Sequence, residues 1–324
     1  MKRYVLSADI GKYETNLVGR CLEGSKEDIQ KVNFRTKMYD LEEGYIDVEG
    51  NSHKTELDGK VYIIGEQGQD KSYDTSKTHI LHKLACYTAI TQYLDPNTKD
   101  NKISMVLACP LSVLRSQSAK EEYKAFIKGE GEINVTVDNK PYSFEITDIM
   151  IKAEGSGIVY LEPELFEGKN TLIVDLGGLN LGGSLYKNKV CKNEDRFIEE
   201  CGHDRLVENV RYQLIDYRKG NNVTVDEAEK ALSDGGLKKS GEIDMESVSY
   251  LRKAKENYYK EVMKHIKEHK IDIDLLDKVV FVGGTTQHIK EIISKEIRHA
   301  YVPVKSQWST VEGLYKIAIK KYGK

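Results

Sequence analysis

The sequence carries one local pattern twice, half a chain apart. In each copy a short apolar strand ends in an Asp-x-Gly turn, which is Asp9-Ile10-Gly11 in the first copy and Asp175-Leu176-Gly177-Gly178 in the second. Two more strand-like segments follow each turn, at 15–22 and 29–34 in the first copy and at 181–186 and 190–197 in the second. Asp175 lies 166 residues after Asp9 in a chain of 324 residues, so the duplicated unit has the size of a domain rather than of a short repeat. We therefore expect two similar domains.

Helical and strand patterns alternate after each of these openings. The helical patterns span residues 79–94, 116–128, 206–217, 289–297 and the segment from Trp308 onward, and the buried-type strands span 103–109 and 279–282. Residues 133–146 alternate in polarity around Asp138-Asn139 and predict a hairpin. A three-strand opening followed by helical crossovers predicts an α/β fold, with a mixed sheet covered by helices on both faces.

Two segments depart from this alternation. Residues 39–76 are polar and dotted with Gly apart from the apolar run 61–64, and we expect a small subdomain or a loop insertion there. Residues 238–271 show one long charged helical pattern, which we expect to be the corresponding insertion in the second half.

Composition excludes several classes of protein. The chain has 49 Lys and Arg against 52 Asp and Glu, so no basic excess exists for direct DNA binding. No apolar run approaches the ~20 residues of a membrane-spanning helix, and Asp9 interrupts the first apolar stretch where a signal peptide needs continuous apolar residues, so we expect a cytoplasmic protein. Five cysteines without a C-x-x-C pair favour reduced, mostly buried thiols over disulfides or a tetrahedral zinc site. The absence of a Walker motif excludes a P-loop ATPase.

Glycine turns after strands are suited to binding phosphate, because several N–H groups converge there and no side chain blocks the approach. Gly283-Gly284-Thr285, at the start of a helix, forms a third turn of this kind. Carboxylates in matching turns of two half-chains, Asp9 and Asp175, can hold a divalent cation through its water shell. Asp side chains also cap their own hairpin turns, and both roles stay open here.

One glutamate occupies a glycine-rich junction between a strand and a helix, Glu154-Gly155-Ser156-Gly157. A carboxylate there can approach a bound phosphate and orient an attacking water. The same residue type near a helix N-terminus also caps the helix and favours its dipole, so a structural role is the alternative.

Together these residues resemble a known family. In chain order, five segments are similar to the phosphate 1, connect 1, phosphate 2, adenosine and connect 2 motifs of the actin, sugar kinase and heat-shock chaperone ATPase superfamily. They are Asp9-Ile10-Gly11, Glu154-Gly155-Ser156-Gly157, Asp175-Leu176-Gly177-Gly178, Gly283-Gly284-Thr285 and Ser309-Thr310-Val311-Glu312-Gly313-Leu314. The short chain and segment 64–84 look like the ParM-type bacterial actin-like proteins that segregate plasmids.

The resemblance implies two RNase H-like, actin-like ATPase domains with a nucleotide cleft between them, each with a small insertion subdomain. The first domain would span residues 1–165 and 306–324, with an insertion at about 37–76. The second would span residues 166–305, with an insertion at about 200–275.

Carried over residue by residue, the resemblance places Asp9 and Asp175 at the water shell of Mg²⁺ and Glu154 beside the hydrolytic water. Glu154 and Asp175 are thus the candidate catalytic residues. The nucleotide-binding candidates are Asp9, Gly11, Lys12 and Asn16 in the first turn, Gly177, Gly178, Leu179 and Asn180 in the second, Gly283, Gly284 and Thr285 beside the adenosine, and Gly202 and Lys230 on the nucleoside side.

Two positions depart from the family pattern. Asn16 stands where many relatives have a phosphate-contacting lysine, and Leu179-Asn180 replaces a pair of hydroxyl-bearing threonines. Both changes leave the backbone donors in place. The resemblance therefore supports nucleotide binding more directly than fast hydrolysis.

The implied activity is polymerisation into filaments with ATP or GTP and Mg²⁺, nucleotide hydrolysis, and movement of plasmid DNA through a ParR-type adaptor on a plasmid centromere. Direct DNA binding and membrane contact are not expected. The alternatives within the superfamily are a small-molecule kinase or an exopolyphosphatase, which needs a second substrate pocket, and a chaperone, which needs a peptide-binding domain. No segment for either addition is apparent in the sequence.

One further motif has a different chemistry. Residues 265–269 spell H-x-x-E-H, the pattern of inverzincin metalloproteases. They lie in a run of Lys and Glu typical of a solvated helix face, and little of the chain follows to supply a third ligand. We expect a surface helix there rather than a zinc site.

Overall fold

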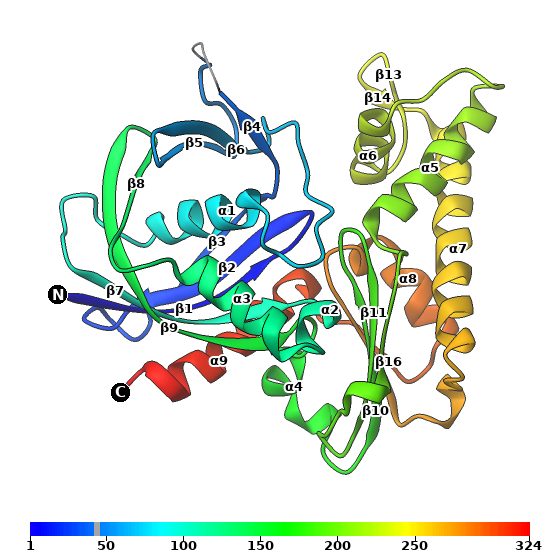
Figure 1. The fold of residues 1–324 in the computed structure, drawn as a ribbon. Helices are drawn as coiled ribbons and strands as arrows, with labels where there is room; N and C mark the ends of the chain where they lie inside the picture. Colours follow the sequence, from blue (N-terminus) through cyan, green and yellow to red (C-terminus); the bar gives the residue numbers. More distant parts are fainter. Residues whose placement is uncertain (42–45) are drawn as a thin grey trace. The chain divides into compact units, whose positions relative to one another are not determined.

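A computed structural model of the chain describes residues 1–41 and 46–324, which form two compact units. Unit 1 comprises Met1–Pro163 and Trp308–Lys324, and unit 2 comprises Glu164–Gln307. Figure 1 traces the chain through the elements of both units. No helix in the described part of the chain is long and apolar enough to cross a membrane. The five cysteines are free thiols, of which Cys86, Cys109 and Cys201 are buried.

Unit 1 is built on a nine-stranded mixed sheet with the strand order β3-β2-β1-β7-β9-β8-β5-β6-β4. Strand β1 pairs antiparallel with β2 and parallel with β7, and β7 pairs parallel with β9. The strands are β1 (Lys2–Ile10), β2 (Glu14–Cys21), β3 (Gln30–Arg35), β4 (Met38–Asp40), β5 (Ser52–Leu57), β6 (Lys60–Gly65), β7 (Asn101–Cys109), β8 (Ile133–Val137) and β9 (Lys140–Ala153). The helices are α1 (Ile80–Thr91), α2 (Leu111–Leu114), α3 (Gln117–Lys128), α4 (Ile158–Leu161) and α9 (Ser309–Tyr322).

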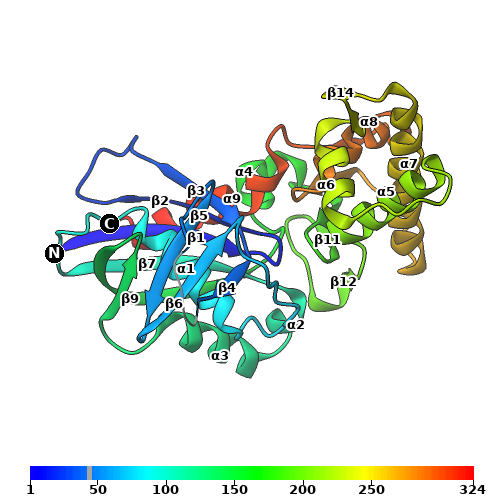
Figure 2. The same ribbon diagram turned by 90° about the horizontal axis from the view of Figure 1, so that it is seen from above.

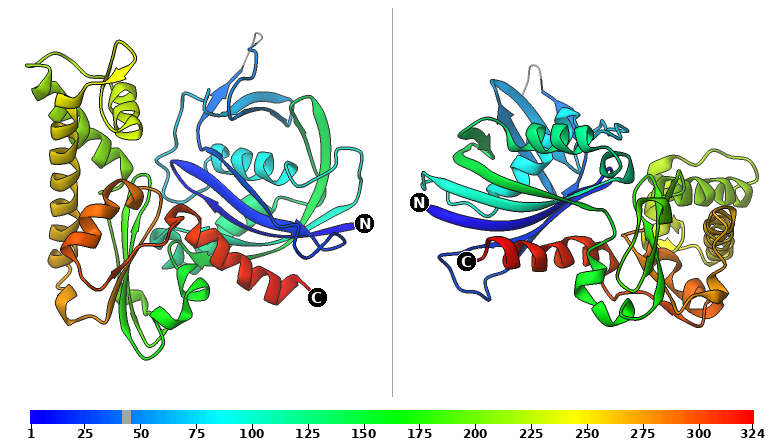
Figure 3. Two further views of the ribbon diagram at one scale, coloured as in Figure 1. Left: turned by 180° about the vertical axis from the view of Figure 1, so that it is seen from behind. Right: turned by 60° about the horizontal axis from the view of Figure 1, so that its bottom comes forward.

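The two faces of this sheet are covered by helices that lie far apart in the sequence. Because side chains alternate along a strand, Leu6 and Ala8 of β1 join the core that contains α1 and α3, whereas Val5 joins the core formed with α9. Figure 3 shows α9 along one face of the sheet. Val311 and Leu314 of α9 are fully buried there, and burial of such a side chain contributes roughly 1.5–3 kcal/mol.

Segment 39–76 is more regular than its polar composition indicates. Strands β4, β5 and β6 extend the main sheet through an antiparallel pairing of β5 with β8, and Figure 2 shows these strands beside α1. The apolar run that the sequence shows at 61–64 forms the buried part of β6. Residues 42–45, which belong to this expected insertion, lie outside the described residues.

Unit 2 repeats the plan of the first strands of unit 1. Its five-stranded sheet has the order β12-β11-β10-β15-β16, in which β10 pairs antiparallel with β11 and parallel with β15. The strands are β10 (Asn170–Leu176), β11 (Leu181–Lys187), β12 (Arg196–Glu199), β15 (Lys278–Val282) and β16 (Ala300–Tyr301), with a separate hairpin of β13 (Lys238–Lys239) and β14 (Glu242–Ile243). The helices are α5 (His203–Tyr217), α6 (Val225–Asp234), α7 (Met245–Glu268) and α8 (Thr286–Glu296). Residues of α5, α7 and α8 form one core with Leu172 and Val174 of β10, and the expected α/β fold of two similar units is confirmed.

Two predicted elements of unit 2 have different bounds. The strand predicted at 190–197 begins only at Arg196, because Asn188 and Lys189 form a tight turn with positive φ and Asn193–Asp195 form a 3₁₀ turn. The helix predicted from residue 238 begins at Met245, where Asp244 accepts a hydrogen bond from the Glu246 amide and caps it. The preceding residues form the β13–β14 hairpin around Ser240 and Gly241, both with positive φ.

Candidate functional site

The first glycine turn follows β1 in unit 1. The Gly11 amide donates to the Glu14 carbonyl at 2.9 Å, and a Cβ on Gly11 would lie 2.6 Å from that same oxygen. This close approach explains why the position is glycine. Asp9 lies on β1 opposite Asn16 of β2, and its Oδ1 atom is buried without a hydrogen-bond partner in the described part of the chain.

The polar side chains predicted at this turn are partly engaged within the protein. Lys12 donates from Nζ to the Tyr73 carbonyl at 3.1 Å, and Asn16 accepts from Asn33 Nδ2 at 2.8 Å. Asn16 is also buried. Both side chains therefore hold the turn to neighbouring strands and loops in this structure.

A buried lysine that the sequence did not reveal lies at the end of β1. Lys77 is only 2% exposed, and its Nζ donates to the Ile10 carbonyl at 2.5 Å and lies 3.4 Å from Oε1 of Glu154. Burial and, after it, the negative charge of Glu154 raise the pKa of Asp9 to about 7, with Lys77 opposing the shift. Asp9, Lys77 and Glu154 thus form one charged cluster, which we call the β1-end cluster.

Glu154 is positioned by the crossing of α4 and α9. The strand β9 ends at Ala153, and the Glu154 amide donates to the Cys109 carbonyl at 2.9 Å. The next amide, Gly155 N, donates to Thr310 Oγ1 at 3.2 Å. A Cβ on Gly157 would lie 2.1 Å from the Thr310 carbonyl oxygen, so only glycine permits α9 to pass this close.

The second glycine turn, in unit 2, is braced by the start of α5. The Gly177 amide donates to the Asn180 carbonyl at 3.0 Å, which closes the turn. Gly202 N donates to the Leu179 carbonyl and His203 N to the Gly177 carbonyl, both at 2.9 Å. The structure therefore brings Gly202 directly against the predicted turn.

The third glycine turn packs on the second. Thr285 donates from its amide to the Leu176 carbonyl at 3.2 Å and from Oγ1 to the Gly177 carbonyl at 3.0 Å. Gly283 has φ +89°, and a Cβ there would lie 2.6 Å from Oδ1 of Asp175. Gly284 has only Gln307 Cβ within 4 Å of its would-be Cβ, at 3.8 Å, so its side-chain direction is open.

The predicted residues thus fall into one group in each unit. Unit 1 brings together Asp9, Gly11 and Glu154 and adds Lys77, while unit 2 brings together Asp175, residues 177–180, Gly202 and residues 283–285. Lys230 is exposed on α6, which packs on α5, and among the described residues no hydrogen bond joins it to either turn of unit 2.

Known proteins are similar to this chain in sequence and fold. Residues 7–157 match the family described as actin-like proteins, N-terminal domain. The structure reported as the Alp12 filament is 53% identical, with 99% of this chain and 100% of that chain covered and a TM-score of 0.72. No curated protein matches the chain.

Two solved structures of lower identity share the fold. A 15-stranded ParM filament from Clostridium botulinum is 14% identical, with 99% of this chain and 100% of that chain covered and a TM-score of 0.75. Ta0583, an archaeal actin homolog in complex with ADP, is 15% identical, with the same coverage and a TM-score of 0.73. With 53% identity to the Alp12 chain along its whole length, this chain belongs to the actin-like protein family.

Proposed function

We propose that this chain binds a nucleoside triphosphate with Mg²⁺, hydrolyses it, and assembles into filaments in the cytoplasm. The observation that carries the nucleotide part is the β1-end cluster, in which two carboxylates and one buried ammonium meet beside a glycine turn. Perturbed, partly buried charges at a turn that can accept phosphate are typical of a catalytic site rather than of a capped hairpin.

Each unit offers groups that suit a nucleotide with its cation. The amides of Gly178 and Leu179 donate no hydrogen bond within residues 1–41 and 46–324, and Gly178 has no side chain to block a phosphate oxygen. Asp9 offers a buried oxygen that lacks a partner in the same part of the chain, which suits a hydrogen bond from a water of a hydrated cation. Bound Mg²⁺ would offset the negative charge on the phosphate oxygens. We assign Asp9 and Asp175 to its water shell.

Glu154 is the proposed base that orients the attacking water. Its side chain is 30% exposed and reachable by water, whereas the Lys77 side chain beside it is 2% exposed. Lys77 therefore acts as a positioning residue that holds the Glu154 carboxylate from the protein side. Lys77 also places a positive charge next to the first turn, where Asn16 provides none.

Self-association is supported by the relatives. Alp12, ParM from Clostridium botulinum and AlfA from B. subtilis plasmid pLS32 are all described as filaments, and the first is 53% identical to this chain. The ADP complex of Ta0583 supports an adenine nucleotide as the ligand. By the same resemblance, we propose plasmid DNA as the cargo, reached through a ParR-type adaptor because the net charge of −3 does not favour direct DNA binding.

Light scattering and phosphate release on the full chain test this proposal. We expect scattering to rise on addition of ATP or GTP with Mg²⁺ and to fall as phosphate is released. Glu154→Gln should still assemble but release phosphate at least tenfold more slowly, because general-base contributions are typically 10²–10⁴-fold. Glu130→Gln, at an exposed glutamate of the same unit, is the control and should behave as wild type.

Three results would count against the proposal. Unchanged phosphate release in Glu154→Gln would remove that residue from hydrolysis. Absence of scattering with either nucleotide would remove filament assembly. Turnover that needs an added sugar and produces no scattering would favour the small-molecule kinase alternative.

A further inference from the structure

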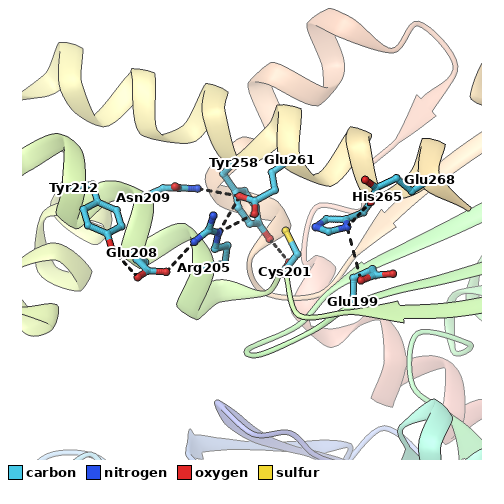
Figure 4. Close-up of polar contacts among 10 residues, drawn as sticks. All are labelled: Glu199, Cys201, Arg205, Glu208, Asn209, Tyr212, Tyr258, Glu261, His265 and Glu268. Atoms are coloured by element: carbon cyan, nitrogen blue, oxygen red, sulfur yellow. Dashed lines mark hydrogen bonds and ion pairs between the residues drawn. The ribbon is translucent and has the colours of Figure 1, made fainter.

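Unit 2 holds a second group of reactive side chains that the proposed function does not use. Cys201 lies in the link between β12 and α5, and Glu261 and His265 lie on α7. One ligand atom from each of the three lies within 4.8 Å of the others. Figure 4 shows the Cys201 sulfur between the Glu261 carboxylate and the His265 ring.

The fold fixes these three residues in place. Glu261 and His265 are four residues apart on α7 and so project from the same face of the helix. One turn earlier on that face, the buried Tyr258 hydroxyl donates to the Cys201 carbonyl at 3.0 Å. This hydrogen bond ties the Cys201 backbone to α7, so the sulfur stays beside the two helical ligands.

Two of the three donors are unsatisfied within the protein. The Cys201 side chain is fully buried, and its sulfur makes no hydrogen bond in the part of the chain that the structure describes. His265 Nδ1 is buried and makes no hydrogen bond among the same residues, although it lies 3.3 Å from a Glu268 oxygen and 3.8 Å from a Glu199 oxygen. Unsatisfied buried donors and acceptors are uncommon and call for a partner.

Neighbouring side chains orient the third donor and set the charge. Arg205 Nε lies 2.8 and 3.0 Å from the two Glu261 oxygens, and Arg205 also pairs with Glu208 at 3.0 Å. Glu199 and Glu268 add two more carboxylates, of which Glu268 pairs with Lys264 at 3.6 Å. Four carboxylates against two cations leave a net negative charge that favours a bound cation.

We propose that Cys201, Glu261 and His265 bind one Zn²⁺ ion. Thiolate, imidazole and carboxylate are the three ligand types that zinc takes in proteins, and three protein ligands leave a fourth position for water. Zinc bonds of about 2.0–2.3 Å place tetrahedral ligands roughly 3.3–3.8 Å apart, so the side chains need to close by about 1 Å. Arg205 then serves as an outer partner that orients Glu261.

This site differs from the H-x-x-E-H motif. His269 Nε2 contacts Glu199 Oε1 at 2.7 Å, and its ring stacks on Phe197 at 4.0 Å, so it is engaged apart from the three ligands. The third ligand comes from Cys201, earlier in the sequence.

A zinc ion bound there would link the segment between β12 and α5 to α7. The next residue in that segment is Gly202, whose amide donates a hydrogen bond to the Leu179 carbonyl of the second glycine turn.

Metal binding to the full chain without nucleotide tests the proposal. After chelator treatment and exchange into buffer with excess MgCl₂, titration with ZnCl₂ should give one tightly bound ion per chain. CoCl₂ should produce a near-ultraviolet sulfur-to-cobalt charge-transfer band. Cys201→Ser and His265→Gln should each lose at least tenfold in Zn²⁺ affinity and remove the cobalt band or shift it, and Zn²⁺ should raise the melting temperature of the wild type by a few degrees.

Matched variants separate this site from others. Cys191→Ser removes a cysteine outside the three ligands, and His269→Gln removes the other histidine of the motif, so both should bind Zn²⁺ like wild type. Loss of binding in His269→Gln with retention in Cys201→Ser would place the metal on the H-x-x-E-H motif and overturn the proposal. Equal Zn²⁺ stoichiometry in wild type and Cys201→Ser would overturn it as well. If Cys201→Ser fails to fold, Glu261→Gln carries the same test.

Discussion

Lys77 has a left-handed backbone φ of +65° in addition to a buried ammonium group. A non-glycine residue in that region costs about 1–3 kcal/mol and persists only where its surroundings impose it. Asp74 stabilises this backbone conformation, because its carboxylate accepts hydrogen bonds from the amides of Ser76, Thr78 and His79. The loop before α1 therefore places Lys77 against the Ile10 carbonyl and Glu154.

Sequence patterns could not identify Lys77. A single lysine among Asp, Ser and Thr before a helix is typical of a solvated cap, and its burial depends on the distant residues Ile10 and Glu154. Asp9, Glu154 and Asp175 were predicted because each lies one or two residues before a glycine whose position marks a turn. Gly202 had only a weak signal, and its contact with Leu179 required the tertiary structure.

Gly283 and Gly284 differ in the space that is available to a side chain introduced at each position. Gly283→Val should destabilise unit 2 by several kcal/mol, because φ is +89° and a Cβ would lie 2.4 Å from the Leu176 carbonyl. Gly284→Val should leave stability within about 1 kcal/mol of wild type, since its Cβ direction is open, but weaken binding of a fluorescent ATP analogue. Urea unfolding and nucleotide titration check both. Wild-type nucleotide affinity in Gly284→Val would remove that glycine from the nucleotide site.

His82 predicts a pH dependence of stability. Its side chain is fully buried on α1 and both ring nitrogens lack partners in the described chain, so burial lowers its pKa to about 3, with the charge of Lys77 adding to the shift. The unfolded chain therefore takes up the proton first, and stability that is complete above about pH 6.5 is lost as pH falls toward 3. From pH 7 to pH 5 the loss should be about 2 kcal/mol.

Urea unfolding of wild type and His82→Leu at both pH values measures this contribution. The variant should lose about 2 kcal/mol less than wild type on acidification, whatever its absolute stability. An equal loss in the two proteins would show that other groups cause the pH dependence.

At the scale of elements, the hydrophobic pattern predicted the first strand of each unit because both strands are buried and regular. The strands β1 and β10 alternate between two covered faces, so their apolar residues mark them directly. Prediction was wrong at β12 and at the start of α7, where turn residues with positive φ interrupt the pattern. Strands β4–β6 were missed because their pairing with β8 is set by tertiary contacts.

The crossing of α4 and α9 gives a prediction at the element scale. Gly313→Ala should destabilise unit 1 by a few kcal/mol, because a Cβ would lie 1.9 Å from the Gly157 carbonyl oxygen. Helix propensity alone would favour alanine over glycine by about 1 kcal/mol, so the sign of the change reports the contact. Lys320→Ala, at an exposed position of α9, is the control in urea unfolding. Stabilisation by Gly313→Ala would show that the helices can move apart at little cost.

At the scale of the whole molecule, the duplicated turn was sufficient to predict two units of one plan, and the family likeness confirms the fold. Each turn is joined by a donor from a distant part of the same unit, which is Lys77 for the first turn and Thr285 for the second. Thr285 was predicted because it follows two glycines at the start of a helix. Lys77 was not, because only the folded loop before α1 places it against β1.

The position of α9 also affects how unit 1 is made during synthesis. Val5 and Val18 are translated early, yet the helix that covers them is translated only after the whole of unit 2. Until α9 is synthesised, the sheet face that carries Val5 and Val18 lacks the helix that covers it and exposes apolar side chains to water. The core of unit 1 that contains Val5 and Val18 can therefore close only after unit 2 has been synthesised.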